Sequence, residues 1–170
     1  PYWSMKNPKH RMRRRDITAE KKADIQDLLD KTCMSATLNT GRDHQHKQAR
    51  YNRLVVAKVT RIENPVIWRM YAAKREAMRA ALFKHRVSPI AVQTDAPWMH
   101  SELDAAVNEK YMWHGLKPKL PNGSDLIEII EENGFDERVG ALGGWFGAGV
   151  YFAEMCSKSD QYCTPDSNDS

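Results

Sequence analysis

The sequence predicts an α+β domain, and three observations carry that prediction. A segment rich in β-branched residues, 54–62, indicates a strand. Apolar residues recur at helical spacing on both sides of it, over about 18–31 and again after Asn64. A glycine-rich stretch, with glycines at 143, 144, 147 and 149, leads into the apolar segment Val150–Ala153. Strand and helix signals alternate along the chain without an internal repeat, which favours a mixed fold.

The composition is that of an ordinary globular domain, with 170 residues, 41% of them hydrophobic and 28% charged. The three cysteines, Cys33, Cys156 and Cys163, form no CxxC pair, which argues against a disulfide framework and a cysteine zinc site. No apolar run approaches ~18 residues and no signal-peptide pattern opens the chain. We therefore expect no membrane contact and an intracellular location, in the nucleus or cytoplasm. Because the chain begins at Pro1, we expect it to be a piece of a longer protein.

Basic residues crowd the first fifteen positions: Lys6, Lys9, His10, Arg11, Arg13, Arg14 and Arg15. Such a run could contact nucleic acid or direct the chain to the nucleus, and a solvated linker tail is the alternative. We interpret residues 1–16 as a basic linker and 17–49 as a helical and loop lead-in. The main domain is expected at 50–170.

Two histidines lie in the polar stretch that follows the first predicted helix, whose N-cap signal at Thr18 is only partial. The spacing His44-x-His46 could ligate a metal. No acidic or cysteine partner lies nearby at a useful spacing, so we predict a surface loop.

Asn64 and Pro65 predict the start of a second helix, as an N-cap followed by proline at the first helical position. Its apolar residues share a broad face: Ile67, Met70, Tyr71, Met78, Ala81 and Leu82. The other side carries Arg69, Lys74, Arg75 and Arg79, which we interpret as a solvated face. A short helical turn is expected between Ala96 and Val107.

A second strand is predicted over 110–115, and prolines at 118 and 121 prevent its extension. After the turn at 122–123, Ser124 is the expected N-cap of a helix that stops at Asn133-Gly134. A third strand, Val150–Ala153, and a short polar helix ending at Tyr162 complete the pattern.

The stretch Gly143–Tyr162 suggests a binding pocket, with a surface hairpin loop as the alternative. Dense glycines suit positions of positive φ or close approach of a ligand. Tyr151 and Tyr162 flank a turn rich in small hydroxyl residues, which is typical of a wall for a flat ring. The glycines precede a strand instead of opening a helix, and no phosphate loop, G-x-S-x-G or HExxH occurs. Dinucleotide-fold, acyl-transfer and zinc-protease chemistries therefore lack their residues.

Four motifs in order then show a family resemblance: Tyr111-Met-Trp-His-Gly115, Gly134-Phe-Asp-Glu-Arg138, Phe146-Gly-Ala-Gly-Val-Tyr-Phe-Ala-Glu154 and Ser157-Lys-Ser-Asp-Gln-Tyr162. Over about 50–162 the chain resembles the catalytic domain of the poly(ADP-ribose) polymerase family, most closely its tankyrase branch. The resemblance implies an ADP-ribosyltransferase-like split β-sheet with flanking helices. It also implies NAD⁺ as substrate, no metal, and transfer of ADP-ribose to a protein or nucleic acid acceptor with release of nicotinamide.

The resemblance implies a role for each matching residue. His114 holds the adenosine-side ribose of NAD⁺, and Gly115 pairs its backbone with the nicotinamide carboxamide. Ser159 makes the third bond to that carboxamide. Tyr162 stacks on the nicotinamide ring, and Tyr151 lies on its opposite side. His114 and Tyr151 are thus the catalytic residues of the implied set, and all five bind the cofactor.

The chain departs from the family pattern after Tyr162. The family's third catalytic position, usually a glutamate on a later strand, has no counterpart in residues 163–170, and we expect the later strands to be missing. Glu154 follows Tyr151 too closely to take that role. Leu116 also replaces a small hydroxyl residue. A non-catalytic module that binds NAD⁺, ADP-ribose or a protein partner is the alternative function.

Overall fold

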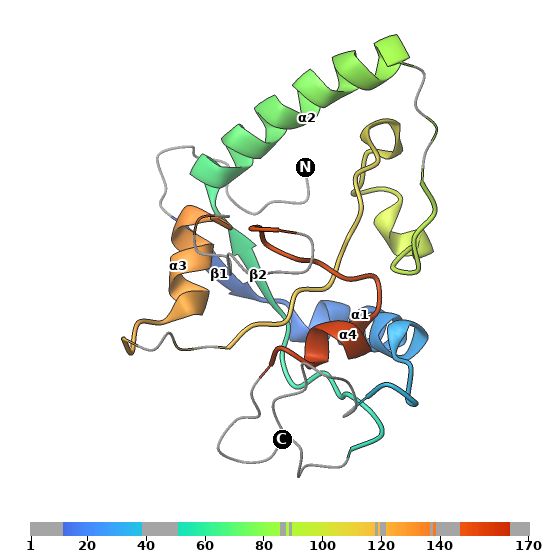
Figure 1. Ribbon diagram of the computed structural model, residues 1–170, viewed down its shortest axis with the longest axis vertical. Helices are drawn as coiled ribbons and strands as arrows, with labels where there is room; N and C mark the ends of the chain where they lie inside the picture. Colours follow the sequence, from blue (N-terminus) through green and yellow to red (C-terminus); the bar gives the residue numbers. More distant parts are fainter. Residues whose placement is uncertain are drawn as a thin grey trace. The chain divides into compact units, whose positions relative to one another are not determined.

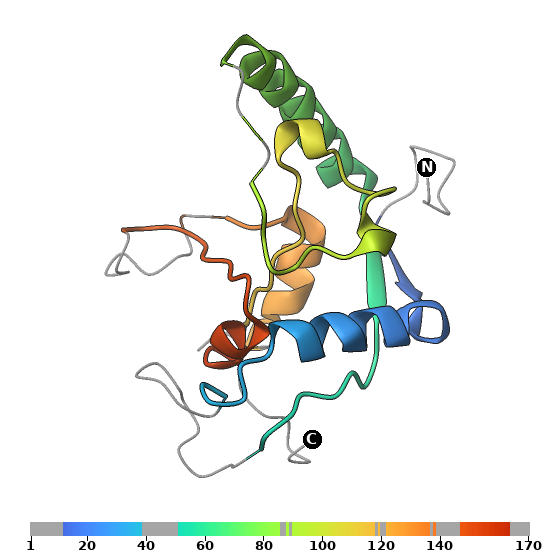
Figure 2. The ribbon, with the colours of Figure 1, turned by 90° about the vertical axis from the view of Figure 1, so that its right-hand side faces the viewer.

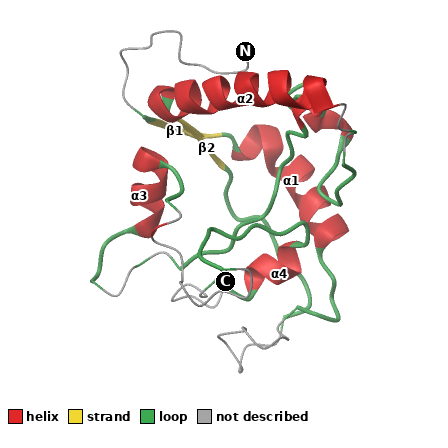
Figure 3. Ribbon diagram, turned by 45° about the horizontal axis from the view of Figure 1, so that its top comes forward, coloured by secondary structure: helices red, strands yellow, loops and turns green. Residues whose placement is uncertain are grey.

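The computed structural model describes residues 12–38, 51–85, 88, 90–117, 119, 122–136, 138 and 147–163. These residues form helices, loops and a small antiparallel sheet, in agreement with an α+β fragment (Figure 3). The split β-sheet stays a prediction, since the sheet of the described residues has two strands. The chain divides into two compact units, residues 1–28 with 56–111 and residues 29–55 with 112–170. The domain boundaries drawn from the sequence likewise stay predictions.

The helix α1 (Thr18–Thr32) confirms the helix expected over about 18–31. Its first turn is capped by Asp16, whose Oδ1 accepts a hydrogen bond from the Thr18 N–H at 2.9 Å. The sequence pointed to Thr18 as the cap, so the cap lies two residues earlier than expected. Hydrogen bonds from Thr18 hold the pKa of Asp16 below its ordinary value.

The sheet pairs β1 (Arg13–Asp16) with β2 (Thr60–Glu63) in antiparallel register (Figure 1). β1 lies inside the stretch 1–16 that we interpreted as a basic linker, so the last four residues of that stretch are a paired strand. Three arginines and an aspartate have little strand propensity, and their extended form depends on backbone bonds to a distant partner.

The predicted strand over 54–62 is only partly formed, because β2 begins at Thr60. Its earlier residues bond to side chains of α1 instead of a neighbouring strand. The Val59 N–H donates to Thr18 Oγ1 and the Val56 N–H donates to Gln26 Oε1, both at 2.9 Å. These bonds satisfy amides that a sheet partner would otherwise satisfy.

The helix α2 (Pro65–His85) confirms the helix predicted from Asn64 and Pro65. Asn64 Oδ1 accepts hydrogen bonds from the Val66 N–H at 3.1 Å and the Ile67 N–H at 3.2 Å. Much of the predicted apolar face is exposed, and Met70 retains 69% of its accessible surface.

The charged side of α2 is largely the solvated face that we expected, since Arg69, Lys74 and Arg79 are exposed, but two of its arginines also pair with acidic residues. Arg79 pairs with Asp104, and Arg75 Nη1 lies 3.5 Å from the buried Glu109 carboxylate. The Arg75 guanidinium also lies over the Trp68 ring, 5.3 Å from its centroid. Ion pairs to residues that follow the helix thus hold this face within the first unit.

Two short 3₁₀ helices, η1 (Pro97–Met99) and η2 (Ala105–Val107), confirm helical turns between 96 and 107. Met99 and Val107 are buried and contribute to the core of the first unit. Asp104 caps η2 by accepting a hydrogen bond from the Ala106 N–H.

In the second unit, α3 (Leu126–Asn133) matches the predicted helix, but its N-cap is Asp125 instead of Ser124. Asp125 Oδ1 accepts hydrogen bonds from the Ile127 N–H at 2.9 Å and the Glu128 N–H at 3.2 Å. The helix ends at Gly134, whose φ of 82° favours glycine, as the sequence predicted.

The strands expected over 110–115 and Val150–Ala153 are reduced to one antiparallel bridge, between Trp113 and Ala153. The short polar helix α4 (Cys156–Asp160) follows, as predicted. Among the described residues, no helix is long and apolar enough to cross a membrane.

Candidate functional site

The second unit brings the Trp-His-Gly and Tyr-Phe-Ala segments together through two backbone bonds. The Trp113 N–H donates to the Ala153 carbonyl at 2.8 Å, and the Ala153 N–H donates back at 2.9 Å. This bridge sets the register of the residues on either side. His114 and Gly115 therefore follow Trp113 at a fixed position relative to Tyr151 and Phe152.

His114 is held by a hydrogen bond to the other segment. Its Nδ1 lies 2.9 Å from the backbone carbonyl oxygen of Tyr151. Because a carbonyl oxygen only accepts, Nδ1 carries the hydrogen of this bond. In the neutral ring the remaining nitrogen, Nε2, then has a lone pair that can accept a hydrogen bond from a hydroxyl group.

Two phenylalanines that are not among the predicted site residues pack against the His114 ring. The ring centroids of His114 and Phe135 lie 4.9 Å apart, and those of His114 and Phe152 lie 5.2 Å apart. The two phenylalanines meet edge to face at 5.0 Å. Each stands in one of the four motifs, so the signal that could have found them was present. The three rings fix the orientation of the imidazole.

Gly115 packs directly against α4, so its lack of a side chain has a steric reason. A Cβ placed on Gly115 would lie 1.8 Å from the Ser159 carbonyl oxygen and 2.7 Å from the Ser159 carbonyl carbon. No other amino acid fits at this separation. This packing places the Gly115 backbone beside Ser159, while the role predicted for Gly115 toward a carboxamide stays a prediction.

The two predicted ring residues retain much of their accessible surface, 42% for Tyr151 and 41% for Tyr162. The Tyr151 hydroxyl donates to the carbonyl of Gly147, whose φ of 92° favours glycine. The Tyr162 ring lies 5.0 Å from the Lys158 ammonium group. Each tyrosine is thus anchored on one side, and both rings keep accessible surface.

The helix α4 is anchored to the last turn of α1 and the turn after it, which lie in the same unit (Figures 1 and 2). The buried Ser157 Oγ accepts hydrogen bonds from the Met34 N–H at 3.3 Å and from Thr37 Oγ1 at 3.2 Å. The Cys156 thiol donates to the Leu29 carbonyl at 3.4 Å. Bonds from Cys156 and Ser157 to this part of the chain therefore fix the helix that carries Ser159.

The bridge is also tied to α1, because the Trp113 Nε1–H donates to Thr32 Oγ1 at 2.9 Å. Thr32 is fully buried. Burial raises the pKa of the nearby Cys156 thiol to about 11, so that thiol is neutral near pH 7. At the other end of α4, the Tyr51 hydroxyl donates to Asp160 Oδ2 at 2.5 Å, and burial raises the pKa of Tyr51.

A match to a protein-family model identifies the family of this chain. The model of the poly(ADP-ribose) polymerase catalytic domain matches residues 33–170, which is most of the chain. The chain belongs to this family. Members of the family are ADP-ribosyltransferases that use NAD⁺ as substrate. The match includes all five residues predicted for the site: His114, Gly115, Tyr151, Ser159 and Tyr162.

The second family motif contains a local ion pair. Arg138 Nε and Nη2 donate to the two carboxylate oxygens of Asp136, at 2.9 and 2.7 Å. The hydrogen bonds from Arg138 lower the pKa of Asp136 to about 2. Both groups are exposed, so the pair shapes the turn after Phe135 and contributes little stability.

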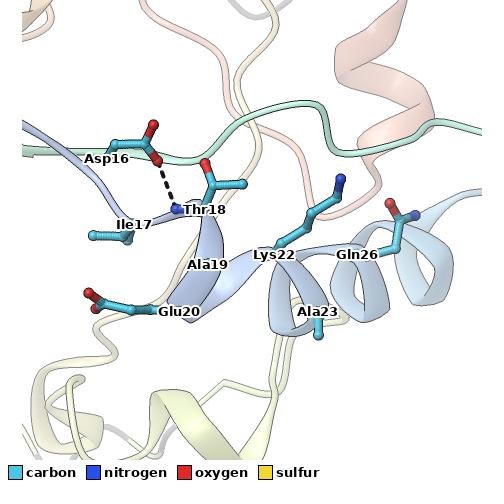
Figure 4. A pocket seen from close by; sticks show the side chains of 8 residues that line it. All are labelled: Asp16, Ile17, Thr18, Ala19, Glu20, Lys22, Ala23 and Gln26. Atoms are coloured by element: carbon cyan, nitrogen blue, oxygen red, sulfur yellow. Dashed lines mark hydrogen bonds between the residues drawn. The ribbon is translucent and has the colours of Figure 1, made fainter.

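A shallow hollow in the first unit lies outside the family match (Figure 4). Its lining comes from one continuous stretch at the start of α1: Asp16, Ile17, Thr18, Ala19, Glu20, Lys22, Ala23 and Gln26. The Asp16 carboxylate in its wall already accepts the Thr18 N–H. Ligand sites are built from polar groups that converge from several elements, so we assign this hollow no role.

Within the part of the chain that the structure describes, no group of three or more His, Cys, Asp or Glu side chains could hold a metal ion. His44 and His46 lie outside the described residues, as do Gly143, Gly144 and most of the basic run. The predictions made for them stay predictions.

Proposed function

We propose that this chain is an NAD⁺ ADP-ribosyltransferase domain whose nicotinamide site is formed by Gly115, Ser159, Tyr151 and Tyr162. The observation that carries the proposal is the close packing of Gly115 against Ser159 within the matched region. It brings a backbone N–H and C=O next to a residue with a hydroxyl group. A carboxamide needs one acceptor, one donor and a second donor or hydroxyl group, and these groups supply them.

The nicotinamide ring then lies between the accessible faces of two tyrosines. Tyr162 stacks on one face of the ring, and Tyr151 covers the other. Ring stacking adds affinity for a flat substrate, and the fixed polar groups select its orientation. Both tyrosines keep accessible surface, which supports this role.

His114 binds the adenosine-side ribose of NAD⁺ through Nε2. The support is the bond from Nδ1 to the Tyr151 carbonyl, which leaves Nε2 as the acceptor in the neutral ring. The packing of His114 against Phe135 and Phe152 holds the ring at that angle.

The reaction breaks the bond between the nicotinamide nitrogen and C1′ of the ribose. The bonding electrons stay with the nitrogen, which neutralises the pyridinium ring, and C1′ develops oxocarbenium character. A nucleophile of the acceptor attacks C1′ and loses its proton. The residues of this chain contribute by holding both ends of NAD⁺ in place while positive charge moves to the ribose.

We propose further that these 170 residues form little polymer by themselves. Residues 163–170 contain no glutamate, so the third catalytic position is not among them. The alternative function is a module that binds NAD⁺ or ADP-ribose without turnover. Labelled NAD⁺ distinguishes the two, because release of nicotinamide requires bond cleavage and binding does not.

We also propose membership of the tankyrase-like branch, a protein acceptor, and an intracellular location in the nucleus or cytoplasm. The sequences Phe-Asp-Glu-Arg, at Phe135, and Gly-Gly-x-Phe-Gly-Ala-Gly, around Gly147, support membership of that branch. A contact of the basic N-terminal run with nucleic acid is a weaker proposal. Its test is a binding curve that falls with rising salt.

Calorimetric titration with NAD⁺, followed by a single-turnover assay of nicotinamide release, tests the proposed site. We expect the wild-type chain to bind NAD⁺. His114→Ala removes one hydrogen bond and should weaken binding about fivefold, from a net ~1 kcal/mol. His100→Ala is the matched control, because His100 is an exposed histidine of the first unit that bonds Asp95. Equal loss in both variants, or no binding by the wild-type chain, would refute the assignment.

A further inference from the structure

The thiol of Cys163 lies next to two residues of the proposed nicotinamide site, Gly115 and Ser159. Cys163 follows α4, and its Sγ–H donates to the Ser159 carbonyl oxygen at 3.7 Å. The same oxygen accepts the Tyr162 N–H at 3.0 Å. Cys163 thus helps to fix the carbonyl against which Gly115 packs.

The same sulfur also faces the Trp-His-Gly segment. It lies 3.1 Å from the position that a Cβ on Gly115 would occupy. The Leu116 N–H donates a hydrogen bond to the sulfur. Partial burial raises the pKa of Cys163, so the thiol stays neutral near pH 7 and can donate and accept at once.

One side chain therefore bonds to both backbone segments that build the site. Its donor bond reaches α4 and its acceptor bond reaches the residue after Gly115. In the sequence, Cys163 is one of three cysteines that form no CxxC pair. Cys156, the cysteine of α4, bonds elsewhere, to the Leu29 carbonyl.

We propose that Cys163 is a positioning residue that holds Gly115 and Leu116 against Ser159, and so keeps the carboxamide-binding groups at their spacing. The proposal rests on the proposed function for its ligand. It predicts that loss of the two sulfur bonds weakens nicotinamide binding even when the chain stays folded.

Three variants test this role. Cys163→Ala removes both bonds and should weaken nicotinamide binding about fivefold, as two weak sulfur bonds allow. Cys163→Ser keeps a donor and an acceptor and should bind within about twofold of the wild-type chain. Cys33→Ala removes a free cysteine of the same unit that lies outside α4 and should leave nicotinamide binding unchanged. If Cys163→Ala does not fold, Cys163→Val replaces it, because valine fills the volume without hydrogen bonds.

Two readouts separate the proposal from the function on which it rests. Hydrogen exchange followed by NMR reports the Leu116 amide, which should exchange faster in Cys163→Ala and be protected again in Cys163→Ser. Calorimetry with nicotinamide reports the site. Unchanged Leu116 exchange, or equal binding by the alanine and wild-type chains, would overturn the role of Cys163. If the wild-type chain binds no nicotinamide, the proposed function is refuted. The role of Cys163 as a positioning residue is then refuted as well, even if Leu116 exchange responds as expected.

Discussion

The replacement of Gly115 by alanine tests the packing on which the proposed site depends. The added Cβ would lie 1.8 Å from the Ser159 carbonyl oxygen, and real Cβ atoms essentially never come closer than 3.0 Å. The two segments must therefore separate by about 1.2 Å. Because the obstructing atom belongs to the backbone of α4, no change of side-chain rotamer can relieve the overlap.

The cost of this separation follows from overpacking of well-packed sites, which destabilises proteins by ~1–3 kcal/mol. A backbone displacement belongs at the upper end of that range. About 3 kcal/mol lowers the Tm of a chain of this length by about 6–12 °C. The displacement also moves the Gly115 backbone away from Ser159, so we expect nicotinamide binding to be lost.

Urea unfolding and calorimetry with nicotinamide measure these two effects. The matched control is Gly149→Ala, since a Cβ on Gly149 meets no atom within 4 Å and its φ lies outside the range that favours glycine. Gly149→Ala should unfold and bind as the wild-type chain does. A Gly115→Ala chain with wild-type stability and wild-type nicotinamide affinity would refute the packing that we describe.

Three further predictions concern the surroundings of the site and the first unit. Ser157→Ala leaves the Met34 N–H and Thr37 hydroxyl without their bonds to Ser157 and should cost ~1–3 kcal/mol in urea unfolding; an unchanged midpoint would contradict the anchoring of α4. The raised pKa of Cys156 predicts that its contribution to the free energy of unfolding is fully present below pH 9 and is lost as the pH rises from about 9 through about 11. Cys156→Ala should reduce that loss, and an equal loss in both chains would contradict the assignment. Asn64→Ala removes the cap of α2 and should destabilise the chain by ~1 kcal/mol. Phe83 is exposed, so Phe83→Ala should leave the stability nearly unchanged, and circular dichroism during unfolding compares the two variants.

Helices with local end signals could be predicted from the sequence. Asn64 and Pro65 mark the start of α2, and Gly134 marks the end of α3, since caps depend on residues a few positions apart. The strands could not be predicted so well. β1 consists of charged residues, and its form depends on pairing with β2 across a long sequence separation.

The charged side of α2 shows the same limit. Arg75 and Arg79 have the spacing of a solvated face, and nothing nearby in the sequence indicates that Glu109 and Asp104 approach them. A hydrophobic pattern shows which residues share a face of a helix. It does not show which distant side chains pair with the residues of that face.

The candidate site could be located from the sequence through its motifs, while its supports could not. His114 and Gly115 were predicted, and the structure pairs them with Tyr151 and Ser159. The ring contacts of Phe135 and the bonds of Cys163 depend on the bridge between distant segments. Such contacts follow from tertiary packing, and the positions of these residues in the sequence do not show which of them meet.

The most direct test of the central claim compares nicotinamide with nicotinic acid by calorimetry on the wild-type chain. The two rings have the same shape, so stacking on Tyr162 and Tyr151 affects them equally. Nicotinic acid has a carboxylate, which cannot donate to the Gly115 carbonyl and is repelled by it. We predict that nicotinamide binds at least about tenfold more tightly, from ~1–2 kcal/mol for the lost bond and the repulsion. Equal affinity for the two ligands, or binding of neither, would contradict the claim.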